Sequence, residues 1–321
     1  MRFNKMNEKA QIFIEKIKAA KSVAIIGHKN PDGDALGSAL ALARLIELNF
    51  GISPVCTYDG NIPETLSDVP LRPRMRYFGH LNVTAPFDVV ILVDYGTARH
   101  LEFATSIIQS AGFLIEIDHH KNDAPIASLC IDDEAADATA VIIFEMMRAM
   151  GWKYDLDILN LLALGIVTDT GYFKFTRNGR VMRIMAEMVD AGVRLRSVYD
   201  MLNNQPKKAI LVETRAAANA EFFYRDRLAV ATISNRDYRN MDGRGENVLD
   251  ILARIKGVEY IALLKQQKEN QIGVSLRGRT KPVNHIAEAL GGGGHMFAAG
   301  AVLRDSLENV HDRVVELFRG V

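Results

Sequence analysis

Histidine and aspartate residues gather at three short points in the first half of the chain. One group lies in the segment Gly-His-Lys-Asn-Pro-Asp-Gly-Asp, one is a single aspartate, and one is an Asp-His-His triplet. In order, these residues are His28, Asp32, Asp34, Asp94, Asp118, His119 and His120. Imidazole and carboxylate donors without thiolate suit Mn, Co, Fe or Zn better than a pure oxygen cage for Ca or Mg. The chemistry that these residue types favour is therefore metal-assisted.

Carboxylates packed closely together repel one another, so they need a cation or some of them must take up protons. A pair of divalent ions about 3.5–4 Å apart relieves that repulsion and is a common clamp for displacement at phosphorus. We expect one aspartate to bridge two such ions and a hydroxide held between them to act as the nucleophile. Asp169, just beyond the apolar stretch 159–167, could complete the set of ligands.

Each of these residues alone also has an ordinary structural explanation. An aspartate after a strand is usually a turn former or a helix cap, and Asp34 could cap a helix that begins at Ala35. Independent turn formers, however, give no reason for histidine to occur twice, each time directly after an apolar strand. The conjunction of the three groups therefore favours a metal site.

The elements that must position these residues alternate between strands and helices. Short apolar runs predict strands at Val23–Ile26, Ile52–Thr57, Val89–Val93 and Phe113–Ile117, and a buried helix is expected over Ala35–Leu48. This alternation predicts an α/β fold, a parallel sheet with helices on both faces. The carboxyl ends of parallel strands meet at one edge of the sheet, so the acids and histidines are expected to converge there.

The second half of the chain has a different pattern. Helical segments are predicted over Asp137–Met150, Leu156–Val167 and Arg180–Ala191. A helix is then expected to start at Pro206, followed by two hairpins and two further helices. We therefore expect a catalytic domain over 1–200, a linker over 201–210, and a smaller α+β substrate-binding domain over 211–321. A cleft is expected between the two domains.

Composition excludes several classes of protein. The 321 residues hold 39 Lys and Arg against 39 Asp and Glu, so a basic surface for long duplex nucleic acid is not expected. Cys56 and Cys130 cannot support a disulfide framework. The amino terminus lacks the apolar core of a signal peptide, and no apolar run approaches the roughly 20 residues of a membrane span. We expect a cytoplasmic protein without a membrane partner, and its oligomeric state stays open.

The motifs resemble those of the DHH phosphoesterase superfamily, in particular its two-domain bacterial type, which includes nanoRNase/pAp phosphatases. The resemblance rests on four ordered motifs and on the glycine-rich segment of the associated C-terminal domain. In order, the matching residues are His28 with Asn30-Pro31-Asp32-Gly33-Asp34, then Asp94, then Asp118-His119-His120, then Gly165–Gly171 with Phe173, and last Ser275-Leu276-Arg277 with Gly292-Gly293-Gly294-His295.

The resemblance implies roles for individual residues. His28, Asp32 and Asp94 are implied to hold one metal ion. A second ion is implied at four residues, with the aspartate shared between the ions: Asp34, Asp94, His119 and Asp169. His120 is implied to donate to the substrate phosphate, and Asp118 to orient a histidine ring. The implied cofactors are two divalent ions, most often Mn²⁺ in this superfamily.

The glycine run of the second domain is expected to form a loop and is a candidate substrate clamp. Backbone without side chains approaches a phosphate or a base closely, and its N–H groups form an anion nest. A flexible helix terminator has the same sequence, and a lone arginine is usually a surface charge. In the context of the resemblance, the expected substrate contacts are Arg277, His295, Gly292, Gly293 and Gly294. Lys174 departs from the arginine that relatives often carry, since it keeps the charge but has no guanidinium fork.

The resemblance implies a metal-dependent phosphoesterase, an enzyme that hydrolyses short oligoribonucleotides to mononucleotides, or pAp to AMP. The alternative is a phosphodiesterase for cyclic di-AMP or for pApA. A pyrophosphatase or exopolyphosphatase ranks lower, because a glycine-rich clamp that accommodates a base is not needed there. A non-catalytic nucleotide-binding module is disfavoured by the complete set of candidate ligands.

Overall fold

The computed structural model describes residues 2–82, 85–122, 124–241 and 245–319. The chain divides into two compact units, Met1–Asn204 and Gln205–Val321. The division falls within the stretch 201–210, which the sequence predicts as a linker. That stretch also includes the end of helix α7 (Leu195–Asn203) and the start of helix α8 (Lys207–Ala218). The linker prediction itself stays a prediction, because the placement of the two units is not determined.

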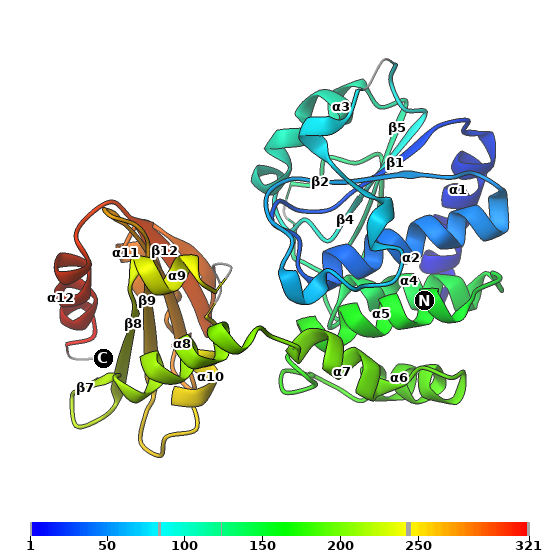
Figure 1. The fold of residues 1–321 in the computed structure, drawn as a ribbon. Helices are drawn as coiled ribbons and strands as arrows, with labels where there is room; N and C mark the ends of the chain where they lie inside the picture. Colours follow the sequence, from blue (N-terminus) through cyan, green and yellow to red (C-terminus); the bar gives the residue numbers. More distant parts are fainter. Residues whose placement is uncertain (1, 83–84, 123, 242–244, 320–321) are drawn as a thin grey trace. The chain divides into compact units, whose positions relative to one another are not determined.

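A parallel sheet of six described strands forms the centre of the N-terminal unit (Figure 1). Its strands are β1 (Val23–Ile26), β2 (Val55–Tyr58), β3 (Met75–Tyr77), β4 (Val89–Val93), β5 (Phe113–Asp118) and β6 (Leu129–Asp132). Their order is β3-β2-β1-β4-β5-β6, and every pair is parallel. The order reverses its direction between β1 and β4, which is where ligands bind in open sheets of this kind.

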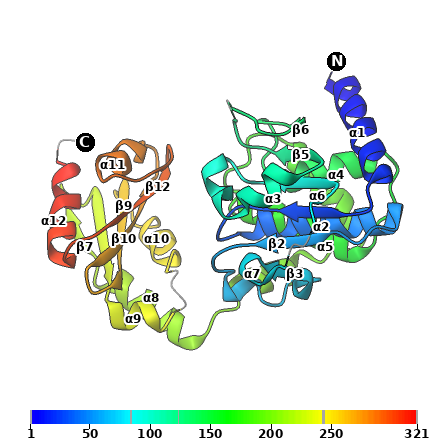
Figure 2. The same ribbon diagram turned by 90° about the horizontal axis from the view of Figure 1, so that it is seen from above.

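Helices cover both faces of this sheet, as the sequence predicts. They are α1 (Arg2–Ala19), α2 (Gly33–Phe50), α3 (Thr105–Ser110), α4 (Thr139–Ala149), α5 (Leu156–Asp169), α6 (Arg180–Asp190) and α7. The 3-10 turns are η1 (Glu64–Leu66), η2 (Arg72–Arg74), η3 (Phe78–His80) and η4 (Ala98–Ala104). Side chains of β1 alternate between the faces: Ile25 packs in the core with α1, α2, α4 and α5, and Ile26 packs with η4 and α3. Figure 2 shows the ribbon of this unit from a second direction. No described helix combines the length and the apolar character needed to cross a membrane.

The C-terminal unit is built on a mixed sheet. Its strands are β7 (Glu221–Phe223), β8 (Leu228–Ile233), β9 (Tyr260–Lys268), β10 (Gln271–Gly278), β11 (Gly293–His295) and β12 (Ala298–Leu303), in the order β11-β12-β10-β9-β8-β7. Strands β8 and β9 are parallel and the other pairs are antiparallel. The helices are α8, α9 (Asn235–Arg239), α10 (Asn247–Leu252), α11 (Asn284–Ala289) and α12 (Leu307–Leu317). The unit is thus the α+β domain that the sequence predicts.

The glycine run differs from its expected form, a loop. Gly293 and Gly294 belong to edge strand β11, which pairs with β12. A Cβ at Gly292 would lie 2.0 Å from the carbonyl oxygen of Gly300, and one at Gly294 would lie 2.6 Å from the Cα of Ala299. Glycine is therefore required there because the neighbouring strand occupies the space of a side chain.

Candidate metal centre

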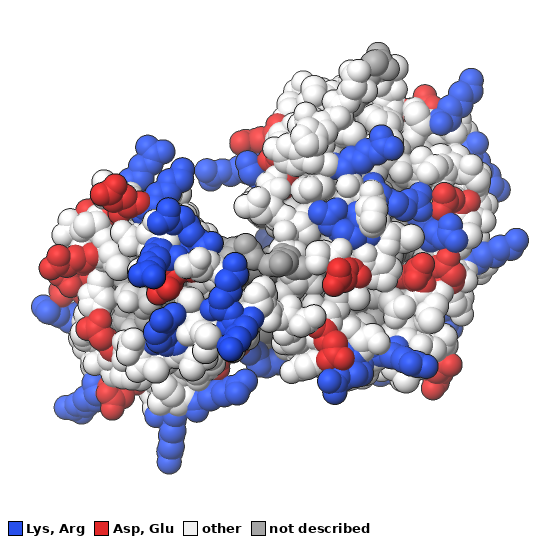
Figure 3. Space-filling model, in the orientation of Figure 1, with Lys and Arg blue, Asp and Glu red and all other residues white. Residues whose placement is uncertain are grey.

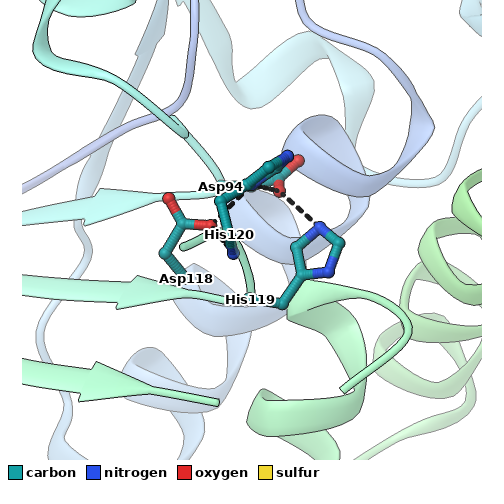
Figure 4. A group of neighbouring side chains, drawn as sticks. All are labelled: Asp94, Asp118, His119 and His120. Atoms are coloured by element: carbon teal, nitrogen blue, oxygen red, sulfur yellow. Dashed lines mark hydrogen bonds and ion pairs between the residues drawn. The ribbon is translucent and has the colours of Figure 1, made fainter. Parts of the chain in front are cut away.

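The ends of three neighbouring strands carry the candidate ligands. His28 follows β1, Asp94 follows β4, and His119 follows β5, and these strands are adjacent in the sheet. Figure 4 shows Asp94, Asp118, His119 and His120 gathered at the ends of β4 and β5. The sheet topology therefore brings together residues that are distant in the sequence, at the point where the strand order reverses.

Three groups of side chains lie close enough to share an ion. Within each group, the ligand atoms lie within 4.8 Å of one another. The groups are Asp94 with Asp118, His119 and His120; His28 with Asp32 and Asp94; and Asp34 with His119 and Asp169. Asp94 and His119 each belong to two groups. The structure thus brings together all eight of the residues that the sequence places at this site, Asp169 included.

One ring nitrogen of His119, Nε2, is positioned to bind a metal ion. Its Nδ1 lies 3.3 Å from the carbonyl oxygen of Ala136, whereas Nε2 is buried and has no hydrogen-bond partner among the described residues. That Nε2 lies 3.2 Å from Oδ2 of Asp169 and 3.6 Å from Oδ1 of Asp94. Burial, together with the charge of His120, lowers the pKa of His119 to about 4. The neutral ring donates from Nδ1 and directs the lone pair of Nε2 at two carboxylates, which is the geometry of a ligand.

Two of the carboxylates implied to hold metal ions are almost completely buried. Asp34 is 1% exposed and Asp94 is 2% exposed. Burial and the charge of Asp32 raise the pKa of Asp34 to about 7, and burial and the charge of Asp34 raise the pKa of Asp169 to about 8. Burial and the same neighbouring acids raise the pKa of Asp94 well above its ordinary value. A divalent cation among them supplies the compensating charge, so these residues fit a metal ion.

Backbone amides hold the first-motif aspartates in place. Oδ1 of Asp32 accepts hydrogen bonds from the amides of Asp34 and Ala35, so Asp32 is the N-cap of α2. Asp34 accepts from the amides of Thr139 and Ala140 at 2.6 and 3.0 Å, at the start of α4. The positive end of that helix dipole favours a carboxylate. The expectation that Asp34 could cap its own helix is therefore wrong, because it caps α4 instead.

Thr139 is a site residue that the sequence does not single out. Its hydroxyl donates to Oδ1 of Asp94 at 3.1 Å. Asp94 itself has a left-handed backbone with φ of 51°, a conformation that aspartate tolerates better than most residues. A threonine at a helix start carries no pattern of its own, so only the fold reveals this contact.

The second histidine of the triplet is held differently from the first. Oδ1 of Asp118 accepts from the amide of His120 and lies 2.8 Å from Nδ1 of its ring. Burial alone would lower the pKa of His120, but the hydrogen bond and charge of Asp118 outweigh it and raise the pKa. The adjacent histidines therefore divide into a neutral His119, suited to a metal, and a His120 that favours the protonated form, suited to an anionic substrate.

A buried hydrogen-bond network around Tyr95 holds Asp118 in position. Oδ2 of Asp118 accepts from the amides of Tyr95 and Gly96, both at 2.9 Å. The hydroxyl of Tyr95 donates to Glu116 at 2.6 Å and accepts from the side chain of Asn122 at 2.7 Å. Tyr95, Glu116 and Asp118 are each 1% exposed. This network fixes the turn after β4, and through it the carboxylate that orients His120.

We expect Tyr95→Phe to lower kcat about tenfold, because partners behind a site residue typically contribute 10–100-fold. The unfolding free energy should fall by about 1–3 kcal/mol, since buried Glu116 loses its donor. Steady-state kinetics and thermal unfolding measure the two effects. Tyr224→Phe is the matched control, because its hydroxyl donates to the carbonyl of Val315 in the C-terminal unit. An unchanged kcat in Tyr95→Phe would contradict the positioning role.

Close packing of α2 against α5 makes Gly165 a sensitive position. A Cβ there would lie 2.5 Å from Oδ1 of Asp34 and 2.9 Å from the Cβ of Ala140. We expect Gly165→Ala to displace Asp34, to lower metal affinity and to destabilise the protein by about 1–3 kcal/mol. Gly112→Ala is the control, because its Cβ would lie 2.8 Å from the carbonyl oxygen of Asp88, at the other end of the strands that carry the ligands. Calorimetric titration with Mn²⁺ should show a loss of affinity in Gly165→Ala alone; equal losses would refute the displacement.

The predicted substrate contacts belong to the other unit. Arg277 lies in β10, opposite Ala298 of β12, and Gly292 lies between α11 and β11. The backbone of His295 is in β11, and its side chain lies outside the described part of the chain. A substrate-binding role for Arg277, Gly292, Gly293, Gly294 and His295 therefore stays a prediction.

Comparisons with known proteins agree with these two units. Residues 22–166 match the family described as "DHH family, N-terminal domain", and residues 226–320 match the "DHHA1 domain". The bifunctional oligoribonuclease and PAP phosphatase NrnA of Thermus thermophilus is 27% identical over 97% of this chain and 94% of its own length. The cyclic-di-AMP phosphodiesterase GdpP of Geobacillus thermodenitrificans is 26% identical over 91% of this chain but only 46% of its own length.

One solved structure resembles the whole chain. An exopolyphosphatase-related protein from Bacteroides fragilis superposes with a TM-score of 0.90 at 20% identity, and the match covers 98% of this chain and 96% of that one. At this identity the likeness shows a shared fold and leaves the substrate open.

Proposed function

This chain belongs to the DHH family, with a C-terminal DHHA1 domain, and on that premise we propose that it hydrolyses short oligoribonucleotides to mononucleotides and pAp to AMP, with manganese. That the chain is a DHH/DHHA1 phosphoesterase follows from the family. The finer statement is supported by the resemblance to the oligoribonuclease and PAP phosphatase of Thermus thermophilus, which extends over nearly the full length of both chains. Such an enzyme would act in the cytoplasm.

The observation that carries the proposal is the position of Nε2 of His119, which has no hydrogen-bond partner in the described part of the chain and lies close to carboxylate oxygens of Asp94 and Asp169. We assign His28, Asp32 and Asp94 to one ion. The second ion is assigned to Asp34, Asp94, His119 and Asp169, so that Asp94 is shared. The mixed nitrogen and oxygen donors without thiolate are the reason for choosing manganese. When bound, the ions would supply positive charge to the phosphate and lower the pKa of water, so that hydroxide is available near neutral pH to attack phosphorus.

The remaining residues hold protons and positions. Nδ1 of His120 faces Asp118, and we propose Nε2 as the donor to a phosphate oxygen as negative charge develops there. Asp118 keeps that ring in one orientation through its contacts with the turn at Tyr95 and Gly96. Thr139 donates to Asp94 and so fixes the carboxylate that both assigned ligand sets share. The proposed reaction is thus the hydrolysis of a phosphoester at a site where hydrogen bonds hold His120, Asp118 and Asp94 in position.

A short substrate also agrees with the charge of the chain. Lys and Arg are balanced by Asp and Glu over the whole sequence. In Figure 3, acidic and basic side chains are interspersed on the visible face of the N-terminal unit, and Lys and Arg gather on that of the C-terminal unit. We propose that the C-terminal unit binds the substrate through Arg277, His295 and Gly292–Gly294. A few local cations suffice for a substrate of two to five nucleotides, whereas a long strand calls for a basic track.

A second candidate function is the hydrolysis of cyclic di-AMP or of its linear product pApA. It is favoured by the similarity to a protein named cyclic-di-AMP phosphodiesterase, over 91% of this chain. The same ligand sets would serve either substrate.

One experiment separates these functions. The protein is incubated with Mn²⁺ and a labelled RNA of two to five nucleotides, a 24-nucleotide RNA, pAp, cyclic di-AMP, pApA or pyrophosphate. Turnover of the short RNA and pAp, in preference to the 24-nucleotide RNA, is the expected result. Preference for cyclic di-AMP would select the second function, and turnover of pyrophosphate alone would overturn both.

We expect His120→Ala to lower kcat by about 10²–10³-fold while the bound metal stays unchanged, because it removes one donor to the developing charge. Metal analysis of the purified protein and steady-state kinetics measure the two quantities. His80→Ala, at an exposed histidine of the same unit, is the control. If His120→Ala loses its metal, the residue is a ligand instead.

A further inference from the structure

The loop that follows Asp169 is held by backbone hydrogen bonds and has a strained backbone. The amide of Tyr172 donates to the carbonyl of Val167 at 2.9 Å, and the amide of Phe175 donates to that of Thr170 at 3.0 Å. Tyr172 and Phe173 have left-handed backbones with φ of 58° and 67°. Bulky residues rarely adopt this conformation, which costs about 1–3 kcal/mol per residue and concentrates at functional sites. The side chains that this strained backbone exposes are therefore candidates for a functional role.

Two large aromatic rings project from this loop. Tyr172 is 45% exposed and Phe175 is 62% exposed, whereas Phe173 between them packs against the core of the N-terminal unit. The strained turn thus anchors one ring inside and presents two outside. They follow Asp169, one of the assigned metal ligands, by three and six residues.

Both outer rings are held in place while part of their surface stays open. The ring of Tyr172 makes an edge contact with that of Tyr199, with centroids 5.9 Å apart, and its hydroxyl accepts from the side chain of Asn203 at 2.7 Å. The ring of Phe175 lies over Gly171, where a Cβ would come within 2.7 Å of it. Nζ of Lys174 lies 4.9 Å from the centroid of the Phe175 ring. Two exposed aromatic rings, one of them with a cation over part of its face, suit a planar base that carries a phosphate.

We propose that Tyr172 and Phe175 form a stacking platform for a nucleobase of the substrate, with Lys174 beside its phosphate. The inference rests on the proposed function, because it names how that substrate is held. Bases stack on aromatic side chains without regard to sequence, which agrees with an enzyme for short RNA of any sequence. A substrate without a base cannot stack on the platform. The platform therefore favours a nucleotide over pyrophosphate as the substrate.

The first test compares substrates with and without bases. Tyr172→Leu and Phe175→Leu keep apolar bulk but remove the aromatic face. Each should raise KM for pApA about tenfold, since stacking contributes about 1–3 kcal/mol per base, and kcat should change little. KM for an analogue in which hydrogen replaces both bases should not change. Tyr172→Phe and Phe175→Tyr should retain the wild-type KM for pApA.

Tyr154→Leu is the matched control. This tyrosine is 49% exposed and lies just before the N-terminal end of α5, whereas the platform follows the C-terminal end. Its replacement should leave KM for both substrates unchanged. Equal KM values for pApA in wild type and in the two platform variants would overturn the proposal, as would an equal rise for the baseless analogue.

A second readout does not depend on catalysis. A dinucleotide containing 2-aminopurine loses fluorescence when its base stacks, and it can be titrated against protein treated with EDTA. Quenching by wild type but not by Tyr172→Leu or Phe175→Leu supports the platform. This holds even if the wild type hydrolyses none of the short RNAs, because that result would refute the proposed function alone. Equal quenching by wild type and both variants overturns the platform and leaves the proposed function standing.

Discussion

Replacing Asp94 by asparagine is expected to lower kcat by about a thousandfold or more and to reduce the amount of bound metal. Asp94 is the residue that we assign to both ions, and it is almost completely buried. Its loss therefore weakens both halves of the proposed centre and leaves the remaining carboxylates with less compensating charge. Removing one stabilising group from such a site typically costs about 10²–10³ in rate, and a shared ligand should cost more.

Asparagine is a better replacement than alanine because it keeps the shape of the side chain while removing the negative charge. It tolerates the left-handed backbone at this position, whereas alanine would add strain. Its side-chain oxygen can still accept the hydrogen bond from Thr139. The variant should therefore fold, and its loss of activity can be attributed to the missing carboxylate.

The matched control is Asp200→Asn, because Asp200 is half exposed on α7 and pairs with Arg196. It should have wild-type kinetics and metal content. Metal bound per chain, measured by atomic absorption, and kcat with Mn²⁺ and pApA or short RNA decide the matter. A rate within tenfold of wild type in Asp94→Asn would exclude the shared role.

The strands that carry the site could be predicted because they are buried on both faces. Val23–Ile26 and Val89–Val93 are continuous apolar runs, and they form β1 and β4 with those bounds. Strands β3 and β6 were not predicted. Met75–Tyr77 is exposed at two of its three residues, and Leu129–Asp132 contains an aspartate and only two fully buried side chains, so neither has the pattern of a central strand.

The candidate ligands could be predicted from their place at strand ends, since strand order then brings them together. The residues that hold them could not. Glu116 lies within an apolar strand, where a carboxylate has no expected role until Tyr95 comes to face it from the turn after β4. Thr139 and Gly165 owe their importance to Asp94 and Asp34, which are distant in the sequence. Contacts of this kind depend on packing, which one sequence without its fold does not specify.

Adding Mn²⁺ to chelator-treated protein is expected to raise the melting temperature of the N-terminal unit by about 5–10 °C. Burial and mutual repulsion raise the pKa values of Asp34, Asp94 and Asp169, so an ion that compensates them should bind the folded state alone. At a free ion concentration of 100 times Kd, such binding adds about 2.7 kcal/mol to the free energy of unfolding. For a unit of this size, each kcal/mol corresponds to about 2–4 °C.

The chain contains one tryptophan, which lets this unit be followed separately. Trp152 is buried in the core of the N-terminal unit, against Phe13 and Phe50, so its fluorescence reports the unfolding of that unit. Activity should disappear with EDTA and return with Mn²⁺. In Asp94→Asn the thermal shift should be much smaller, whereas Arg277→Ala, in the other unit, should retain it. If Mn²⁺ leaves the tryptophan transition of the wild type unchanged, the buried acids do not bind an ion in the folded protein, and their repulsion must instead be relieved by protons.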